Sequence, residues 1–223
     1  MYRRFIRDAL YKVIDLPYSH ATYATTTKDE PEAEPLSVTS PDSQLISAIR
    51  LNDSHAFALL MQRHLQRVLA VSQRIMGNEA DADEVTQETF MRFWNYAPKW
   101  ETGDPAGVRT WLNRVATNLC IDRLRRQRNV PLDEAGEIED ETPNAADTIQ
   151  KQDRREVFRS LLLKLPPRQR AAIVLAYYED MTITQIAQAM ELTQGAADSL
   201  LVRGRKNLRD LLAKRGIKLE EDV

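Results

Sequence analysis

The stretch "MTITQIAQAMELTQGAADSLLVRGRKNLRDLLAKRG" (residues 181–216) decides the fold of the C-terminal part of this 223-residue chain. Thr182 and Gln185 form the T-x-x-Q pattern of a capping box, which predicts the start of a short helix. After a tight turn, Thr193 can cap a longer helix that reaches about Lys214. A short helix, a turn and a longer helix with a basic end are the arrangement of a helix-turn-helix.

The longer helix carries side chains that suit DNA contact. The second helix of such a motif lies in the major groove, where polar side chains read base edges and cations bind phosphates. The residues expected to face DNA are Gln194, Asp198, Ser199, Val202, Arg203, Arg205 and Lys206. An ordinary helical hairpin with a basic end is the alternative. The caps, the core spacing and the charge placement together favour DNA binding.

A second basic segment, "WLNRVATNLCIDRLRRQR", covers residues 111–128. Helical spacing predicts that Leu112, Val115, Ala116 and Leu119 face a core. The opposite side is expected to carry Arg114, Thr117, Asn118, Ile121, Arg125 and Arg128. Residues 108–129 hold six Arg against one Asp, so pairing within the helix does not account for the charge. A polyanionic partner explains it better than a merely solvated face.

Composition favours an all-α protein with separate binding surfaces. Hydrophobic residues make up 43% of the chain and charged residues 29%, and only seven glycines occur. The net charge of −2 conceals strong segregation. Residues 79–88 carry five acids and no base, and residues 130–150 carry seven acids and no base. Such blocks indicate distinct surfaces for distinct partners.

Several classes of site are not expected. Cys120 is the single cysteine, so no internal disulfide can form, and the three histidines lack the spacing of metal ligands. The sequence predicts neither a metal site nor a cofactor. No nucleophile–base set or phosphate-cradling glycine loop indicates an enzyme with a small-molecule substrate. Without an apolar run that could span a bilayer or a secretory signal, the chain is expected to be cytoplasmic.

The predicted organisation is two small helical domains joined by an acidic linker. Residues 1–40 are expected to form a flexible extension with a short amphipathic helix, whose role the sequence leaves open. Residues 41–129 form the first domain, and residues 130–150 form the linker. Residues 151–215 form the second domain with the helix-turn-helix, and residues 216–223 form a tail.

Three segments resemble the extracytoplasmic-function (ECF) group of bacterial sigma factors. They are "DADEVTQETFMRFW" (81–94), "TWLNRVATNLCIDRLRRQR" (110–128) and "LPPRQRAAIVLAYYEDMTITQIAQAMELTQGAADSLLVRGRKNLRDLL" (165–212). They follow one another in the order and spacing of that group. The linker is too short for the extra domain of larger sigma factors. By this resemblance, the two predicted domains are similar to sigma regions 2 and 4.

The resemblance implies an alternative sigma factor that binds core RNA polymerase and directs it to promoters of a stress- or signal-responsive regulon. The helix after Asn78 would bind the β′ clamp helices through Asp83, Glu84, Gln87, Glu88 and Phe90. The next helix would recognise and melt the −10 element through Trp111, Arg114, Thr117, Asn118, Arg125 and Arg128, and loop 97–107 would capture a flipped base. The helix-turn-helix would read the −35 element while its other side meets the β flap.

The resemblance leaves several points open. Asp198 and Leu200 stand where the group commonly has basic residues, so the −35 sequence cannot be carried over. Most members are held inactive by an anti-sigma factor, which is expected here and could hold the chain at the inner membrane. The alternatives are a stand-alone helix-turn-helix regulator and a sigma-like decoy that binds an anti-sigma factor.

Overall fold

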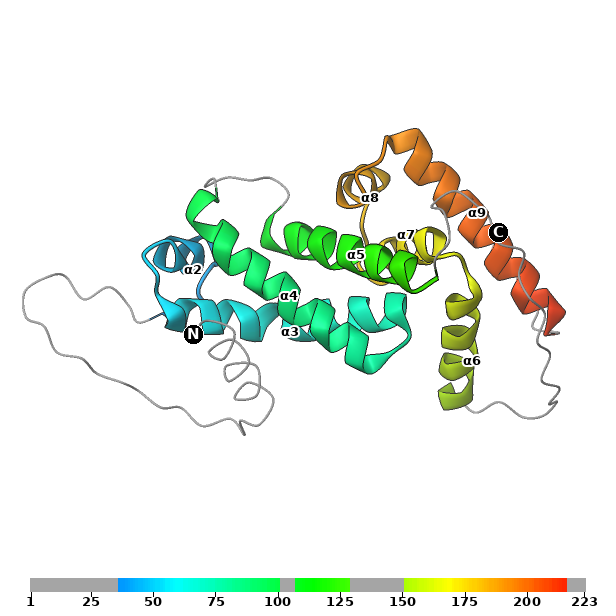
Figure 1. Cartoon of the computed structure of the whole chain (residues 1–223), viewed down its shortest axis with the longest axis horizontal. Helices are drawn as coiled ribbons and strands as arrows, with labels where there is room; N and C mark the ends of the chain where they lie inside the picture. Colours follow the sequence, from blue (N-terminus) through cyan, green and yellow to red (C-terminus); the bar gives the residue numbers. More distant parts are fainter. Residues whose placement is uncertain (1–35, 101–106, 129–150, 216–223) are drawn as a thin grey trace, which may run out of the picture. The chain divides into compact units, whose positions relative to one another are not determined.

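The computed structural model describes residues 36–100, 107–128 and 151–215, and every regular element in these ranges is a helix (Figure 1). The predicted all-α fold is confirmed. None of the helices in the described ranges has both the length and the hydrophobicity needed to cross a membrane. The predicted N-terminal helix and the acidic linker lie outside the described residues.

The chain divides into two compact units, and the first combines Met1–Gln66 with Gln87–Pro105. Its described helices are α2 (Asp42–Ile49), the start of α3 (Ser54–Met76), the end of α4 (Glu79–Tyr96) and the short 3-10 helix η1 (Ala97–Lys99). Aromatic side chains fill its core. Phe57 meets Trp94 edge-on with ring centroids 4.9 Å apart, and Phe93 packs against Trp100 at 5.7 Å.

An ionic contact joins α2 to α3 in the first unit. The Asp42 carboxylate accepts from Arg63 and lies 3.1 Å from His64 Nε2. Burial opposes ionisation of this carboxyl, but His64 and Arg63 outweigh burial and hold the pKa of Asp42 below its usual value. The start of α2 is thereby fixed against α3.

The second unit combines Arg67–Thr86 with Ala106–Val223. Besides the remaining parts of α3 and α4, it contains α5 (Gly107–Arg128), α6 (Lys151–Lys164), α7 (Pro167–Tyr177), α8 (Ile183–Ala189) and α9 (Gln194–Lys214). The boundaries of these compact units differ from those of the predicted domains 41–129 and 151–215. The cut falls within α3 and α4, and α5 groups with the C-terminal helices because it contacts α7 and α8.

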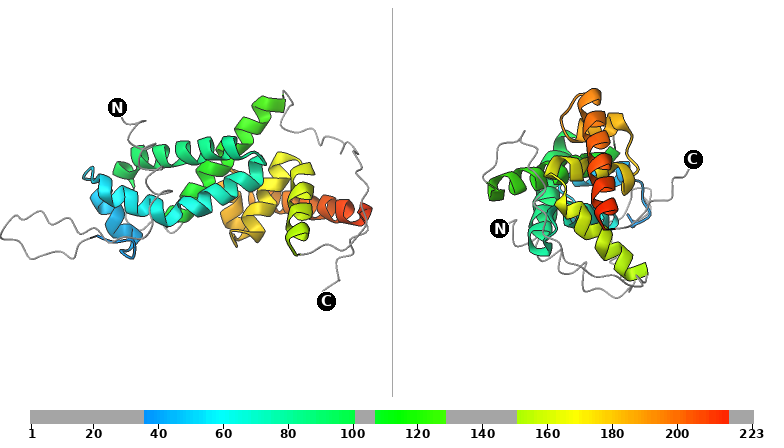
Figure 2. Two further views of the ribbon diagram at one scale, coloured as in Figure 1. Left: turned by 90° about the horizontal axis from the view of Figure 1, so that it is seen from below. Right: turned by 90° about the vertical axis from the view of Figure 1, so that its right-hand side faces the viewer.

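The helix-turn-helix forms as its local sequence predicts. The Thr182 hydroxyl accepts from the Gln185 backbone N–H, and the Gln185 side chain accepts from the Thr182 backbone N–H. The Thr193 hydroxyl accepts from the backbone N–H of Ala196 and caps α9, which continues without interruption after the turn (Figure 2). Gly204 lets α9 approach α7, because a Cβ there would lie only 3.1 Å from Ile173 Cγ1.

A buried arginine joins three helices of the second unit. Arg170 on α7 is only 2% exposed. Its Nη1 donates to the carbonyl oxygen of Ile75 at 2.6 Å, near the end of α3. Its Nη2 donates to the carbonyl oxygens of Leu163 at 2.8 Å and Leu165 at 3.1 Å. Because the last carbonyls of a helix lack partners within that helix, one guanidinium satisfies two helix ends at once.

Helix α5 is covered on more sides than its sequence predicts. Leu112, Ala116 and Cys120 are fully buried, as a core-facing stripe should be. Thr117 and Ile121, however, are 0% and 7% exposed, although the helical pattern placed them opposite the core. That part of the prediction is wrong, because α7 and α8 pack on α5 in the second unit.

The contacts of Arg170 predict a large effect of Arg170→Met. The substitution removes the charge but leaves buried carbonyl oxygens without donors, so we expect a loss of about 2–3 kcal/mol in the free energy of unfolding. The midpoint of urea denaturation measures this loss. Arg159→Met, at an exposed position on α6, is the matched control and should change stability little. Equal stability of the two variants would contradict the role of Arg170.

The buried thiol of Cys120 gives a second prediction. Burial raises the pKa of this thiol to about 12, so almost no thiolate forms at mildly alkaline pH. A maleimide reagent should therefore label the native protein slowly and the urea-unfolded protein quickly at the same pH. Mass spectrometry over time measures both rates. Rapid labelling of the native protein would show that this part of α5 opens readily.

Candidate nucleic-acid and protein-binding surfaces

The DNA-facing side predicted for α9 is open to solvent. All of its residues are exposed, namely Gln194, Asp198, Ser199, Val202, Arg203, Arg205 and Lys206. Val202 is an apolar side chain that is 53% exposed. Beside polar and cationic neighbours, such a group suits contact with a thymine methyl group. The helix thus presents hydrogen-bond donors, hydrogen-bond acceptors, cations and one apolar side chain to solvent.

Hydrogen bonds within the motif orient several of these side chains. Gln194 Nε2 donates to Thr184 Oγ1 at 3.0 Å, across the turn from α8 to α9. Ser199 Oγ donates to the Gly195 carbonyl at 2.8 Å, and Arg203 Nε donates to the Ser199 carbonyl at 3.2 Å. These bonds restrict the rotamers of polar groups that are otherwise solvated.

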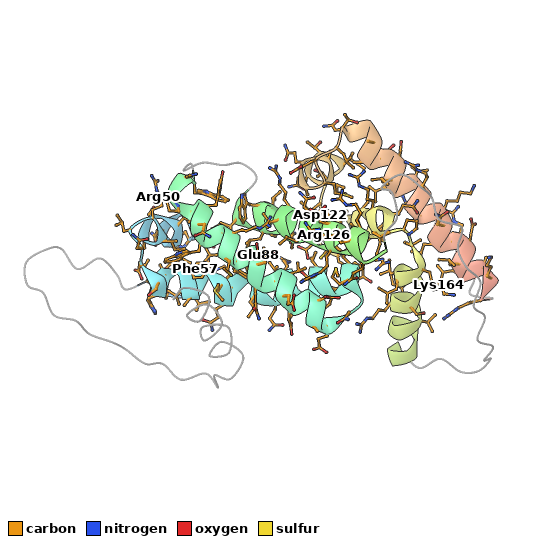
Figure 3. The ribbon with its side chains drawn as sticks, viewed as in Figure 1. Arg50, Phe57, Glu88, Asp122, Arg126 and Lys164 are labelled. Carbon is orange, nitrogen blue, oxygen red and sulfur yellow. The ribbon has the colours of Figure 1, made fainter. Side chains whose placement is uncertain are left out.

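The acidic residues of α4 are largely accessible. Asp83 and Glu84 are exposed on the part of α4 in the second unit, and Gln87 and Glu88 are partly exposed on the part in the first unit. Glu88 is labelled on α4 in Figure 3. Burial and the nearby Glu79 carboxylate raise the pKa of Asp83 above its usual value. Negative charge is therefore concentrated at the start of α4, near the positive end of the helix dipole.

Ion pairs engage part of this acidic surface. Arg123 of α5 pairs with Glu84 and lies 3.7 Å from the Asp81 carboxylate in the second unit. In the first unit, Arg92 Nε lies 2.9 Å from Glu88 one turn along the helix. Pairs as exposed as these contribute little stability and can be exchanged for another partner.

Phe90 does not belong to an accessible surface. Its side chain is 0% exposed in the core of the first unit. Its assignment to direct polymerase contact is therefore wrong for this conformation. The resemblance to the ECF group assigned Phe90 to this contact together with Gln87, but its side chain lies on the buried side of α4.

The residues predicted for the −10 element lie in different surroundings. Arg114 is half exposed, Asn118 is half-buried, and Thr117 between them is fully buried. Trp111 is half-buried, and Arg125 is exposed beside Asp122, 3.5 Å away. Asp122 and Arg126 are labelled along the same helix in Figure 3. The side chain of Arg128 and loop residues 101–106 lie outside the described residues.

Two glutamates that the sequence reasoning missed contact this part of α5. Glu191, in the turn between α8 and α9, accepts from Arg114 Nη2 at 2.9 Å and from Asn118 Nδ2 at 3.3 Å. Glu179, just after α7, is 3% exposed and accepts from Asn113 Nδ2 at 2.9 Å. The one sequence signal is an acidic residue in each turn, which does not identify a partner more than sixty residues away.

Both parts of the chain match known families. Residues 60–130 match the family model of Sigma-70 region 2, and residues 155–208 match that of Sigma-70, region 4. The first match contains α4, α5 and most of α3. The second contains the helix-turn-helix.

Curated relatives match most of this chain. The ECF RNA polymerase sigma factor SigM of Mycobacterium tuberculosis is 30% identical over 171 residues, which cover 77% of this chain and 84% of SigM. SigE of Mycolicibacterium smegmatis is 33% identical over 159 residues, covering 70% of this chain but only 61% of SigE. SigW of Bacillus subtilis is 26% identical over 178 residues, covering 75% of this chain and 94% of SigW.

Two solved structures share the fold. CnrH in complex with the cytosolic domain of CnrY gives a TM-score of 0.56 at 24% identity, covering 78% of this chain and 97% of that chain. RpoE in complex with the anti-sigma factor NepR, from Bartonella quintana, gives 0.53 at 23% identity, covering 70% and 96%. With both Sigma-70 regions in order and SigM 30% identical over most of its length, this chain belongs to the ECF sigma factors of bacterial RNA polymerase.

Proposed function

We propose that this sigma factor contacts its promoter at two places, reading the −35 element with α9 and the −10 element with α5, while α4 binds core RNA polymerase. The observation that carries the proposal is the exposed face of α9, on which every residue expected to meet DNA is accessible. Behind this face, the complete capping box fixes α8 and Gly204 allows close packing on α7. A rigid helix with accessible polar side chains is suited to the major groove.

Base readout by α9 would combine donors and an unusual acceptor. Arg203 is placed to donate to guanine or to a phosphate, and Gln194 can pair with adenine. Asp198 has no favourable contact with phosphate, but its carboxylate can accept from cytosine N4. We therefore expect a −35 element with a cytosine at the position that Asp198 faces.

Helix α5 would hold the strand that melting exposes. Arg114 and Arg125 can neutralise backbone phosphates, and the Asn118 amide can bond to a base edge. Unstacking a base costs a few kcal/mol, so a cationic surface that binds the separated strand favours the melted state. The burial of Thr117 assigns it to packing on this helix rather than to direct base contact.

The acidic start of α4 would bind a basic helical partner, which in this family is the β′ clamp. Asp83 and Glu84 are accessible carboxylates in this part of α4, as is Glu79, and burial together with the Glu79 charge raises the pKa of Asp83. Gln87 and Glu88 are further polar side chains of α4, about one turn closer to its C-terminal end. Exchange of the Arg123 pair for a polymerase cation would cost little.

The proposed function depends on binding to polymerase and promoter and not on catalysis by this chain. We propose that the chain has no enzymatic activity of its own and acts in the cytoplasm, where polymerase and promoter meet. We also propose an anti-sigma partner, since RpoE of Bartonella quintana, which shares the fold, forms a complex with the anti-sigma factor NepR. Co-purification with the products of neighbouring genes tests this last point, and its consistent absence would remove the support.

Run-off transcription from genomic fragments tests the proposed function. Core polymerase from the source bacterium should give new transcripts only when this protein is added, and their start sites should define both promoter elements. Tight core binding without new transcripts would indicate a decoy. DNA binding without core binding would indicate a stand-alone regulator.

The double substitution Arg114→Ala with Asn118→Ala tests the role of α5. We expect about a tenfold loss of open complexes, because each lost contact to a base or phosphate weakens binding to the melted strand. Permanganate footprinting measures melting, and co-elution measures core binding, which should not change. Arg126→Ala, at an exposed position on the same helix, is the control. Loss of core binding in the double variant would show that this side of α5 faces polymerase.

A further inference from the structure

We infer that, in the free sigma factor, the turn of the helix-turn-helix closes over α5, so that Glu191 and the melted promoter strand compete for Arg114 and Asn118. The inference rests on the proposed role of α5 in binding the −10 element. It concerns contacts within the second compact unit, which contains both α5 and the helix-turn-helix.

The chemistry of the contact is that of a nucleic-acid mimic. A single oxygen, Glu191 Oε1, accepts from Arg114 Nη2 at 2.9 Å and from Asn118 Nδ2 at 3.3 Å. A phosphate oxygen would accept from the same guanidinium, and a base carbonyl oxygen would accept from the same amide. One carboxylate thus occupies both donors through which α5 is proposed to hold the separated strand.

The backbone at Glu191 supports a dedicated role for its side chain. The residue has a φ of +55°, in the left-handed region that favours glycine, and it follows the C-cap residue of α8. Two other described turns have the same conformation at Asn52 and Asp180, residue types that adopt it readily. Glutamate does so less readily, and here the conformation directs its carboxylate to α5.

The contact between the turns and α5 combines a buried hydrogen bond, which stabilises it, with an exposed ion pair, which is easily displaced. Glu179 holds Asn113 in a buried hydrogen bond, so Glu191 is not the single link between the turns and α5. The Arg114–Glu191 pair, however, is half exposed on both sides, and such pairs are readily displaced. Asn113 Oδ1 and Thr117 Oγ1 are buried with no hydrogen-bond partner among the described residues. Opening would return these two buried polar atoms to water.

The substitution Glu191→Gln tests the competition. It keeps the size of the side chain and the strained backbone but removes the charge that attracts Arg114. The probe is a labelled single-stranded oligonucleotide with the −10 non-template sequence of a promoter mapped by run-off transcription. Fluorescence anisotropy measures its affinity for the full-length free protein and for the holoenzyme.

For the free protein, we expect Glu191→Gln to bind the oligonucleotide about three- to fivefold more tightly than the wild type, because the binding-competent fraction rises. For the holoenzyme, in which binding to core polymerase would already have opened the contact, the two affinities should agree. Asp210→Asn, which removes the same charge from an exposed position on α9, controls for a general electrostatic effect. An equal gain in this control would overturn the inference.

A second measurement reports closure without DNA. Spin labels at Ala80→Cys and Ala213→Cys occupy exposed positions on α4 and α9, and the buried Cys120 should stay unlabelled. The distance distribution of the free protein should shift to longer values on Glu191→Gln and stay unchanged on Asp210→Asn.

The two proposals fail in different ways. If Glu191→Gln changes neither the distance distribution nor the affinity of the free protein, closure is overturned and the −10 role of α5 stands. If Arg114→Ala with Asn118→Ala leaves oligonucleotide binding by the holoenzyme intact, the −10 role fails and the competition fails with it. A shift in distance would then show a closed contact that has no effect on promoter binding.

Discussion

The second compact unit depends on one buried guanidinium. Arg170 donates to carbonyl oxygens near the end of α3 and around the end of α6, while its own helix α7 forms the base on which α9 packs. Helix ends need partners for their last carbonyls, and a charged donor with several N–H groups can supply them where water is excluded. The position of the helix-turn-helix within this unit therefore depends on the same contact that completes two other helices.

One side of helix α5 packs in the core, and another side carries polar residues that contact the turns after α7 and α8. Leu112, Ala116 and Cys120 are buried as a core stripe, while Asn113 and Arg114 are held by glutamates from the turns after α7 and α8. Because these glutamates use acceptor chemistry that DNA also offers, the same side chains can serve an internal contact or a promoter contact, but not both at once. In the closed conformation one arginine of this helix, Arg114, thus has a partner from the same unit.

Charge segregation along the chain matches the proposed division in function. The exposed cations and polar groups of α9 are proposed to bind promoter DNA, and the acids of α4 are proposed to bind a basic protein surface. Arg123 pairs with Glu84 and Asp81, which offsets part of the repulsion between the acids at the start of α4. These exposed pairs are weak enough that assembly with polymerase can replace them.

The sequence alone determined the features that depend on neighbouring residues. The caps at Thr182 and Thr193 and the bounds of the helix-turn-helix arise from bonds between residues a few positions apart, so a local pattern suffices to predict them. The exposure of α9 was also predictable, because its polar face has no apolar residue that demands burial except Val202.

Only the tertiary structure decided which stripe of an amphipathic helix is covered. Phe90 and Thr117 were assigned to surfaces but are buried, because packing from distant segments closes over them. The partners of Arg114 and Asn118 lie 77 and 73 residues along the chain, and no periodicity in the sequence relates positions so far apart. Long-range contacts of this kind arise from how preformed helices pack, which a local pattern of polar and apolar residues does not specify.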